Sequence, residues 1–500
     1  MAVNVLSLVI FLPLVAAAVL AVLPQIGDAA ARWSWLAIAA VEVVLVAFVW
    51  ARYDTPAPGR LALQEQVKWI PGVRSSYHVG IDGLSLPLVA MTVVLFLACA
   101  FYSLRQSNRP RLHAALLLFL QGVSLGLFLA ADLILFFVFF DLSIVAMYFL
   151  IAGWGHAGAL RSALQFFLYT FLGSLALLVG FIGLYVYSDP HTFDMVELTA
   201  QIPLAGHGVT GGFVLAAVLL GLAVKTPVVP FHTWLPPAHS DASAVGSAVL
   251  AGVLLKMGTY GFVRIAMPML PQAWQSWAWV IIVIGIISVL YGALVALAQR
   301  DLKRMIAYTS VNHMGYIVMA VGAAGLVAQN TGKARGIAVT GAVTQMVSHG
   351  LITGALFLLA GTLHDRADTY DMDQFGGLAR TAPRLAGLFA VGAFASLGLP
   401  ALSGFIAEFQ IFTGSIAVAP VTAVALLGIL ITAALFLRGL QQVFTGELTG
   451  KAVGFADLAT REVCSAGILL GLSLLIGIYP APLLAIIDPA SSAVITLLGR

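Results

Sequence analysis

Six ionisable residues lie within long apolar stretches of the sequence, where a charge is costly. They are Asp141, Lys225, Lys256, His313, His349 and Glu408. A charge at membrane depth is expensive unless it is paired or hydrated, so such residues usually serve ion or proton movement. Lysine shifts its pKa readily when desolvated, and histidine titrates near neutrality. The series therefore predicts a path along which protons are held and passed on.

The first lysine of this series stands beside a predicted helix break. Lys225 is followed by Pro227 and Pro230. Each proline removes a backbone donor, which lipid tolerates only where the freed carbonyls face protein or a wet cavity. A second break is predicted in residues 398–404, which include Pro400. Interrupted helices of this kind are typical of transport sites near the middle of the membrane.

Two histidines follow the first predicted break. His232 and His239 are candidates for feeding protons into the path, or for binding the carbonyls that the prolines leave free. Metal binding by this pair is not expected, because Pro236 and Pro237 lie between them and no cysteine is near. Both of their roles remain open from the sequence.

The composition predicts an all-α polytopic membrane protein. Hydrophobic residues make up 61% of the 500 residues and charged residues 9%. About 14 apolar runs approach the ~20 residues needed to cross the hydrocarbon. The predicted breaks fall in helices 7 and 12, five helices apart, which favours two inverted five-helix repeats, although two unrelated proline kinks would give the same pattern.

The expected organisation has four parts. Residues 1–110 hold helices 1–3 with an exported loop, and residues 111–268 hold the first repeat, helices 4–8. Residues 269–442 hold the second repeat, helices 9–13, and residues 443–500 hold a loop, helix 14 and a C-terminal tail.

Basic residues predict the orientation. Loops after odd-numbered helices contain, among others, Arg109, Arg161 and Lys303. The positive-inside rule places these loops in the cytoplasm and both termini on the periplasmic side. Arg264 is expected to extend towards lipid headgroups from a helix end. His364 and the acidic residues after it are expected in a solvated loop.

Several kinds of site are not expected. The two cysteines, Cys99 and Cys464, are too few and too far apart for a disulfide framework or an iron–sulfur site. The net charge is only +3 and no glycine-rich phosphate loop follows a strand-like segment, so we expect no nucleic-acid partner. Without a haem, flavin or iron–sulfur motif we also expect no cofactor and no metal. A self-sufficient substrate carrier or a structural spacer remains an alternative, but the protonatable series favours ion movement.

Long motifs in the sequence resemble the antiporter-like subunits of respiratory complex I. The matching stretches are Lys225-Thr226-Pro227, residues 231–239, residues 254–261, and residues 301–310 with His313-Met314-Gly315. The likeness extends from about Gly80 onward. Residues 404–409, which include Glu408, are similar to the M-type subunit, the bacterial counterpart of mitochondrial subunit 4, since sister subunits have lysine there.

The resemblance implies a proton-translocating membrane-arm subunit of NADH-quinone oxidoreductase, without redox chemistry of its own. It implies a multi-pass protein of the bacterial cytoplasmic membrane, flanked by other membrane-arm subunits. The alternative is the D-type subunit of a multisubunit Na⁺/H⁺ antiporter, or the membrane subunit of an energy-converting hydrogenase.

The resemblance also implies roles for the six residues. Asp141 is expected to pair with Lys225 and to modulate its pKa, and Lys256 to relay protons at the centre. The two histidines of the series continue the path, and Glu408 ends it near the next subunit or an exit. The family usually has glutamate at position 141, so the shorter Asp141 is expected to weaken the pairing without abolishing it.

Overall fold

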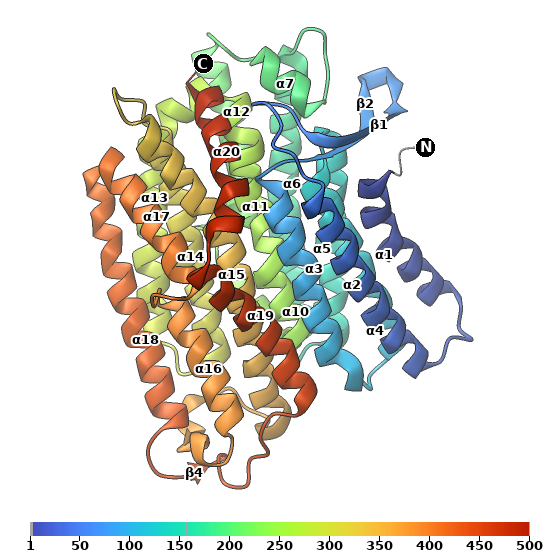
Figure 1. Cartoon of the computed structure of the whole chain (residues 1–500), viewed down its shortest axis with the longest axis vertical. Helices are drawn as coiled ribbons and strands as arrows, with labels where there is room; N and C mark the ends of the chain where they lie inside the picture. The colour runs from blue at the N-terminus through green and yellow to red at the C-terminus, as the bar shows by residue number, and fades with distance from the viewer. Residues whose placement is uncertain (1–3, 157, 500) are drawn as a thin grey trace.

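The chain folds into a bundle of helices that run roughly along one direction, with short strands only at its ends (Figure 1). The computed structural model describes residues 4–156 and 158–499. The helices are α1 (Val5–Val22), α2 (Asp28–Ala51), α3 (Ser85–Tyr102), α4 (Pro110–Leu129), α5 (Leu133–Trp154), α6 (Ala159–Tyr187), α7 (Met195–Gln201), α8 (Gly208–Lys225), α9 (Leu235–Asp241), α10 (Ala244–Val249), α11 (Leu255–Gly261), α12 (Met267–Met269), α13 (Pro271–Leu297), α14 (Leu302–Ala324), α15 (Gly332–Ala367), α16 (Pro383–Ser396), α17 (Ser403–Val418), α18 (Leu426–Phe444), α19 (Thr460–Ile478) and α20 (Ala481–Leu498). The strands are β1 (Ala62–Ile70), β2 (Ser75–Ile81), β3 (Phe375–Gly376) and β4 (Thr449–Gly450).

The predicted all-α polytopic fold is confirmed. Among the described residues, 13 helical stretches are long and apolar enough to cross a membrane. All residues in the apolar stretch of α15 are buried, whereas only one third are buried in those of α1, α2 and the segment that contains α18, as expected for helices that face lipid. The C-terminal tail expected after helix 14 is instead α20, which is itself one of the 13 stretches.

The two ends of the bundle differ. One end, which we call the hairpin face, carries the antiparallel hairpin of β1 and β2 (Figure 1). Both ends of the described chain lie there, since Ser7 Oγ is 2.8 Å from Tyr77 Oη and Gln275 donates to Leu498 O at 2.6 Å. The other end, which we call the β4 face, carries the pair of β3 and β4.

Both predicted helix breaks are confirmed. The first helix ends as α8 at Lys225 and resumes as α9 at Leu235. The second ends as α16 at Ser396 and resumes as α17 at Ser403. In between, Gly398 has a φ of +74°, a left-handed conformation that favours glycine. The breaks thus occur at the ionisable positions, while the inverted repeats remain a prediction.

A third irregularity was not predicted. Helices α10, α11 and α12 are joined by π-helical turns at η3 (Leu250–Leu254) and η4 (Phe262–Ala266). A π turn leaves a carbonyl outside the regular ladder, and such turns are frequent at functional sites. Lys256 lies two residues beyond η3, and its Nζ donates to Ala251 O within that turn. The irregular turn therefore supplies an acceptor to a buried amine.

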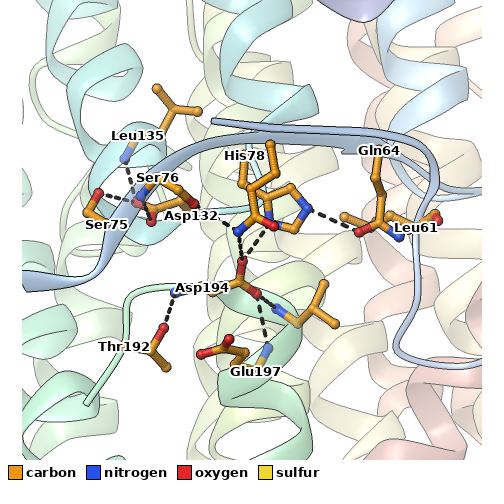
Figure 2. Close-up of polar contacts among 12 residues, drawn as sticks. Leu61, Gln64, Ser75, Ser76, His78, Asp132, Leu135, Thr192, Asp194 and Glu197 are labelled. Atoms are coloured by element: carbon orange, nitrogen blue, oxygen red, sulfur yellow. Dashed lines mark hydrogen bonds and ion pairs between the residues drawn. The ribbon is translucent and has the colours of Figure 1, made fainter. Parts of the chain in front are cut away.

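The hairpin is fastened to the bundle by two buried carboxylates (Figure 2). Asp132 caps α5 and accepts from Ser75 Oγ and Ser76 N, both at 3.0 Å. Asp194 caps α7 and accepts from His78 Nδ1 at 2.5 Å. Burial raises the pKa of Asp132 despite these hydrogen bonds. The network connects β2 with the helices that begin beside it.

Helices α13 and α14 approach closely through glycines. A Cβ on Gly285 would lie 2.5 Å from Met319 N, and a Cβ on Gly315 would lie 2.7 Å from Val289 N. Small residues at such contacts let membrane helices pack backbone against backbone. Because His313 is two residues before Gly315, this contact also sets the position of a candidate site residue.

We predict that Gly315→Ala destabilises the protein, because a backbone atom cannot move aside as a flexible side chain can. Overpacking of this kind costs about 1–3 kcal/mol. The thermal unfolding temperature of the detergent-purified protein should fall by several degrees. Gly467→Ala in α19 is the control, since a Cβ there meets nothing within 4 Å. Equal unfolding temperatures for the two variants would contradict the packing argument.

We predict that the Asp194 contact makes stability sensitive to acid. Burial opposes ionisation, but the hydrogen bond and charge of His78 and the amides of Val196 and Glu197 hold the pKa of Asp194 below its ordinary value. A carboxylate of this kind stabilises the fold above its unfolded pKa of about 4, and the contribution is lost as pH falls through the folded pKa.

Thermal unfolding should therefore show that Asp194→Asn costs about 1–3 kcal/mol at neutral pH and less at about pH 3. The control is Glu197→Gln, whose exposed pair with Arg74 at 3.5 Å should contribute little. An Asp194→Asn protein as stable as the unmodified one at neutral pH would disprove this role.

Candidate functional site

Lys225 ends α8 deep inside the protein. Its side chain is 1% exposed, and Nζ donates to Ser143 Oγ on α5 at 3.0 Å. The same Nζ lies 4.7 Å from the centroid of the Phe140 ring, within the range of a cation–π interaction. A hydroxyl and an aromatic ring therefore replace part of the hydration that this amine loses.

The expected ion pair between Asp141 and Lys225 is not formed in the described structure. Ser143, two residues further along α5, contacts the amine instead. Positions two residues apart on an α-helix point about 200° apart, so only one of these side chains can face Lys225. Asp141 is half-buried, and its Oδ1 has no hydrogen-bond partner. The two residues are therefore not in direct contact in the described structure.

Lys256 and His349 form the central contact of the site. Lys256 Nζ lies 2.6 Å from His349 Nδ1, and both side chains are buried. A protonated lysine only donates, so while Lys256 is charged Nδ1 accepts and the ring proton of a neutral imidazole is on Nε2. His349 Nε2 has no hydrogen-bond partner among the described residues. This geometry leaves a buried donor directed away from the amine.

His313 is complementary to His349. The two ring centroids are 5.2 Å apart. His313 Nε2 donates to Ser396 O at 3.1 Å, which leaves Nδ1 as the acceptor of a neutral ring. That Nδ1 is buried without a partner in the described part of the chain. One imidazole thus offers a free donor and its neighbour a free acceptor, as a proton relay requires.

Glu408 continues this series beyond His313. Its Oε1 lies 3.7 Å from His313 Nε2, and the residue is 5% exposed. A cavity of about 10 Å³ is lined by His313, Gln345, His349, Ser396 and Glu408, among others. This volume is close to the minimum that holds one water molecule. The predicted residues from Lys256 to Glu408 are therefore brought together in one polar row.

The two auxiliary histidines lie apart from each other. His232 is in the loop between α8 and α9, with its ring 5.1 Å from that of Tyr291. His239 on α9 is fully buried, stacks on Phe357 at 4.5 Å, and has two unpaired ring nitrogens in the described structure. His239 lies within the electric field of both Lys256 and Lys303. Only His239 is placed beside the central row.

Lys303 is a site residue that sequence reasoning missed. The orientation rule assigned it to a loop, but it is 0% exposed, and its Nζ donates to Ala242 O at 2.5 Å. Nζ also lies 4.9 Å from the centroid of the Tyr370 ring. The apolar residues that follow Asp301-Leu302-Lys303-Arg304 were the available signal that α14 starts inside the protein.

The structure also corrects the expectation for Arg264. Instead of extending to lipid headgroups, its Nη1 pairs with Asp82 Oδ2 at 2.5 Å, and both side chains are largely buried. Asp82 also accepts from Leu84 N and Ser85 N at 3.0 Å. Arg264 lies in the π turn η4, which directs its side chain towards the hairpin face. The pair is a structural contact at that end of the helix carrying Lys256.

The fold and the site define a polytopic membrane protein with a buried row of protonatable groups between broken helices. Residues 130–434 match the family model described as NADH:quinone oxidoreductase/Mrp antiporter, TM. Similar proteins include NAD(P)H-quinone oxidoreductase chain 4 2 of Thermosynechococcus vestitus, 37% identical over 98% of this chain and 91% of the relative. NADH-quinone oxidoreductase subunit M of Rickettsia prowazekii is 38% identical over 84% of each chain.

A solved structure gives the same result. A chain of respiratory complex I from Thermus thermophilus with bound NADH matches with a TM-score of 0.88 and 30% identity, over 99% of this chain and 100% of that one. The chain therefore belongs to the family of antiporter-like membrane subunits, in its M-type or chain 4 branch. The resemblance noted in the sequence is confirmed.

We predict that Gly398→Ala impairs proton movement, because the new Cβ would collide with Glu408 Oε2. The left-handed φ of Gly398 adds strain of about 1–3 kcal/mol. Proton transfer should fall several-fold in reconstituted membranes. Gly387→Ala, where a Cβ meets nothing within 4 Å, is the control and should be normal. Full proton transfer by Gly398→Ala would show that the Glu408 position is not critical.

Proposed function

We propose that the chain is a proton-translocating membrane-arm subunit of NADH-quinone oxidoreductase, driven by electron transfer from NADH to quinone elsewhere in the complex. The observation that carries this proposal is the contact of Lys256 Nζ with His349 Nδ1 at 2.6 Å, continued to Glu408 through His313. Family membership supports the assembly with other membrane-arm subunits.

The proposed path begins at Asp141 and Lys225 and ends at Glu408. Between the two lysines, α8 packs on α11, where a Cβ on Gly258 would touch Thr226 Oγ1. Thr226 Oγ1 is buried and unpaired in the described structure, so water beside it would connect the two halves. Each charge that moves against the membrane potential requires about 2.3 kcal/mol per 100 mV, which the redox reaction supplies.

The proposed location is a bacterial cytoplasmic membrane. In this orientation the β4 face is cytoplasmic and the hairpin face, with both ends of the chain, is periplasmic. Arg109, Arg161, Arg300 and Arg380 belong to the segments at or next to the β4 face, which supports the orientation by the positive-inside rule. Burial of Lys303 removes one of the charges on which the rule relied.

We predict that Lys256→Ala abolishes most NADH-driven proton pumping by the complete complex in proteoliposomes. Oxidation of NADH by a water-soluble acceptor should be unchanged, because that reaction does not pass through this chain. Lys333→Ala is the matched control, since Lys333 is exposed at the start of α15. Full pumping without Lys256 would refute its relay role.

Asp141 gives a second test of the same path. Asp141→Asn removes the charge that acts on Lys225 and should lower coupled turnover strongly, whereas Asp141→Glu should be tolerated. Both rates are measured as quinone-linked NADH oxidation with its proton uptake. Near-normal pumping by the asparagine variant would exclude Asp141 as part of the switch.

A further inference from the structure

A cluster of titratable side chains at the β4 face is not used by the path described above. It consists of His156, His364 and Tyr370 above the buried Lys303. His156 belongs to the loop between α5 and α6, and His364 to the last turn of α15. Residues from four separate segments therefore converge at one point on this face.

Backbone contacts fix the cluster in place. Leu302 N donates to Tyr370 O at 2.9 Å, which holds the loop after α15 against the start of α14. His156 N donates to Asp241 O at 2.7 Å, which holds the α5–α6 loop against the end of α9. Ser162 Oγ donates to Asp241 Oδ2 at 2.5 Å. The side chains above them are thus positioned by hydrogen bonds.

The rings of the cluster form a continuous stack. The centroids of His156 and His364 are 4.2 Å apart, and those of His364 and Tyr370 are 4.4 Å apart. Tyr370 in turn covers Lys303, whose Nζ is 4.9 Å from its centroid. His156 is half-buried and His364 is 18% exposed, so the stack extends from the protein surface to the buried amine.

The polar atoms of the stack are only partly paired. His156 Nε2 is buried and has no hydrogen-bond partner among the described residues. His364 Nε2 lies 3.8 Å from Asp368 Oδ1, a carboxylate that is exposed to solvent. Burial, then the charges of Lys303 and His364, lower the pKa of His156 to about 4. At neutral pH this imidazole is therefore uncharged and able both to accept and to donate a proton.

Other charged groups face the cluster from the elements around it. They are Lys303 on α14, Asp301 before α14, Asp241 at the end of α9, and Asp365 and Asp368 around the end of α15. Arg304 acts on Asp301 and Arg366 acts on Asp365, so carboxylates and basic groups are interspersed around the cluster. A cleft of about 210 Å³ is lined by Tyr102, Ser243 and Asp365, among others, and Asp365 is the residue next to His364.

Lys303 connects the cluster with the interior. Its Nζ donates to Ala242 O, and His239 lies three residues earlier, one turn back along α9. Neither ring nitrogen of His239 has a hydrogen-bond partner among the described residues, and the charges of Lys303 and Lys256 both act on this ring. Lys303 and His239 are therefore the two buried titratable residues through which the proposed route runs from the stack to the central lysine.

We propose that the stacked His156 and His364 collect protons at the β4 face and deliver them through Lys303 and His239 to Lys256. The proposal rests on the proposed function and names its entry site. The reaction is proton transfer alone: each imidazole accepts a proton on one ring nitrogen and releases one from the other, and water carries the released proton to Lys303 and on to His239. No oxidant or reductant is needed.

The test is the double variant His156→Phe/His364→Phe in the complete complex, reconstituted in proteoliposomes. Phenylalanine keeps the ring stack but removes the proton-exchanging nitrogens. NADH-driven proton uptake should fall about tenfold above pH 8, less than the ~100-fold typical of a positioned proton-transfer group, because water provides a slower route. Imidazole added on the side of the β4 face should restore uptake.

Two controls separate this inference from the proposed function. His207→Phe removes an exposed imidazole that packs on Tyr187 at the hairpin face, and it should pump normally. Lys256→Ala should fail to pump and should not recover with imidazole. If Lys256→Ala pumps normally, the proposed path itself is wrong. If Lys256→Ala fails to pump but the double variant pumps normally, the proposed path stands and the proposed entry site is wrong.

Two further outcomes also test the proposed entry site. A loss of pumping that imidazole does not restore would overturn the proposal, because it would show that the stack only supports the structure. Should the double variant fail to assemble, His156→Asn alone carries the test, since it removes one partner and keeps a polar side chain. It should show a smaller loss that imidazole restores, and normal uptake would refute the proposal.

Discussion

The structure depends on one constraint, the free-energy cost of placing ionisable groups among apolar helices. An unpaired buried charge destabilises a protein strongly, and lipid offers no water to compensate for it. Lys225 is stabilised by Ser143 and the ring of Phe140, and Lys256 by Ala251 O and His349. Each of these two lysines thus has a hydrogen-bond acceptor, and neither forms an ion pair with a carboxylate in the described part of the chain.

The hydrogen-bond partners of Lys225 and Lys256 have a functional consequence. A direct ion pair would hold each ammonium in one state, whereas a hydroxyl, a carbonyl and an imidazole accept hydrogen bonds without fixing the charge. In the described structure, the gaps in the row occur between the neighbouring rings of His313 and His349, each with one unpaired nitrogen, and beside Thr226 Oγ1, which is also unpaired. A path built in this way is connected by small rearrangements of side chains and water, so a distant reaction can drive it.

Irregular backbone leaves carbonyl oxygens free to accept hydrogen bonds, whereas in a regular helix these oxygens are already paired. The break after α8, the break between α16 and α17, and the π turn η3 each lie beside one of the charged residues. Glycines permit the helices around them to approach closely, as Gly315 does against α13. Two polar clusters lie outside this row, the Arg264–Asp82 pair at the hairpin face and the His156–His364 stack at the β4 face.

The sequence by itself determined the membrane class, both proline breaks and the residues of the row, because apolar length, proline and charge are local properties. It did not determine side-chain partners. Ser143 lies 82 residues from Lys225, and Asp82 lies 182 residues from Arg264, so helix rotation and packing decided these contacts. Likewise, only the fold showed that Lys303 is buried, since a lysine at a helix start is equally compatible with solvent. Tertiary packing therefore determined which charged residues contact each other and which of them are buried.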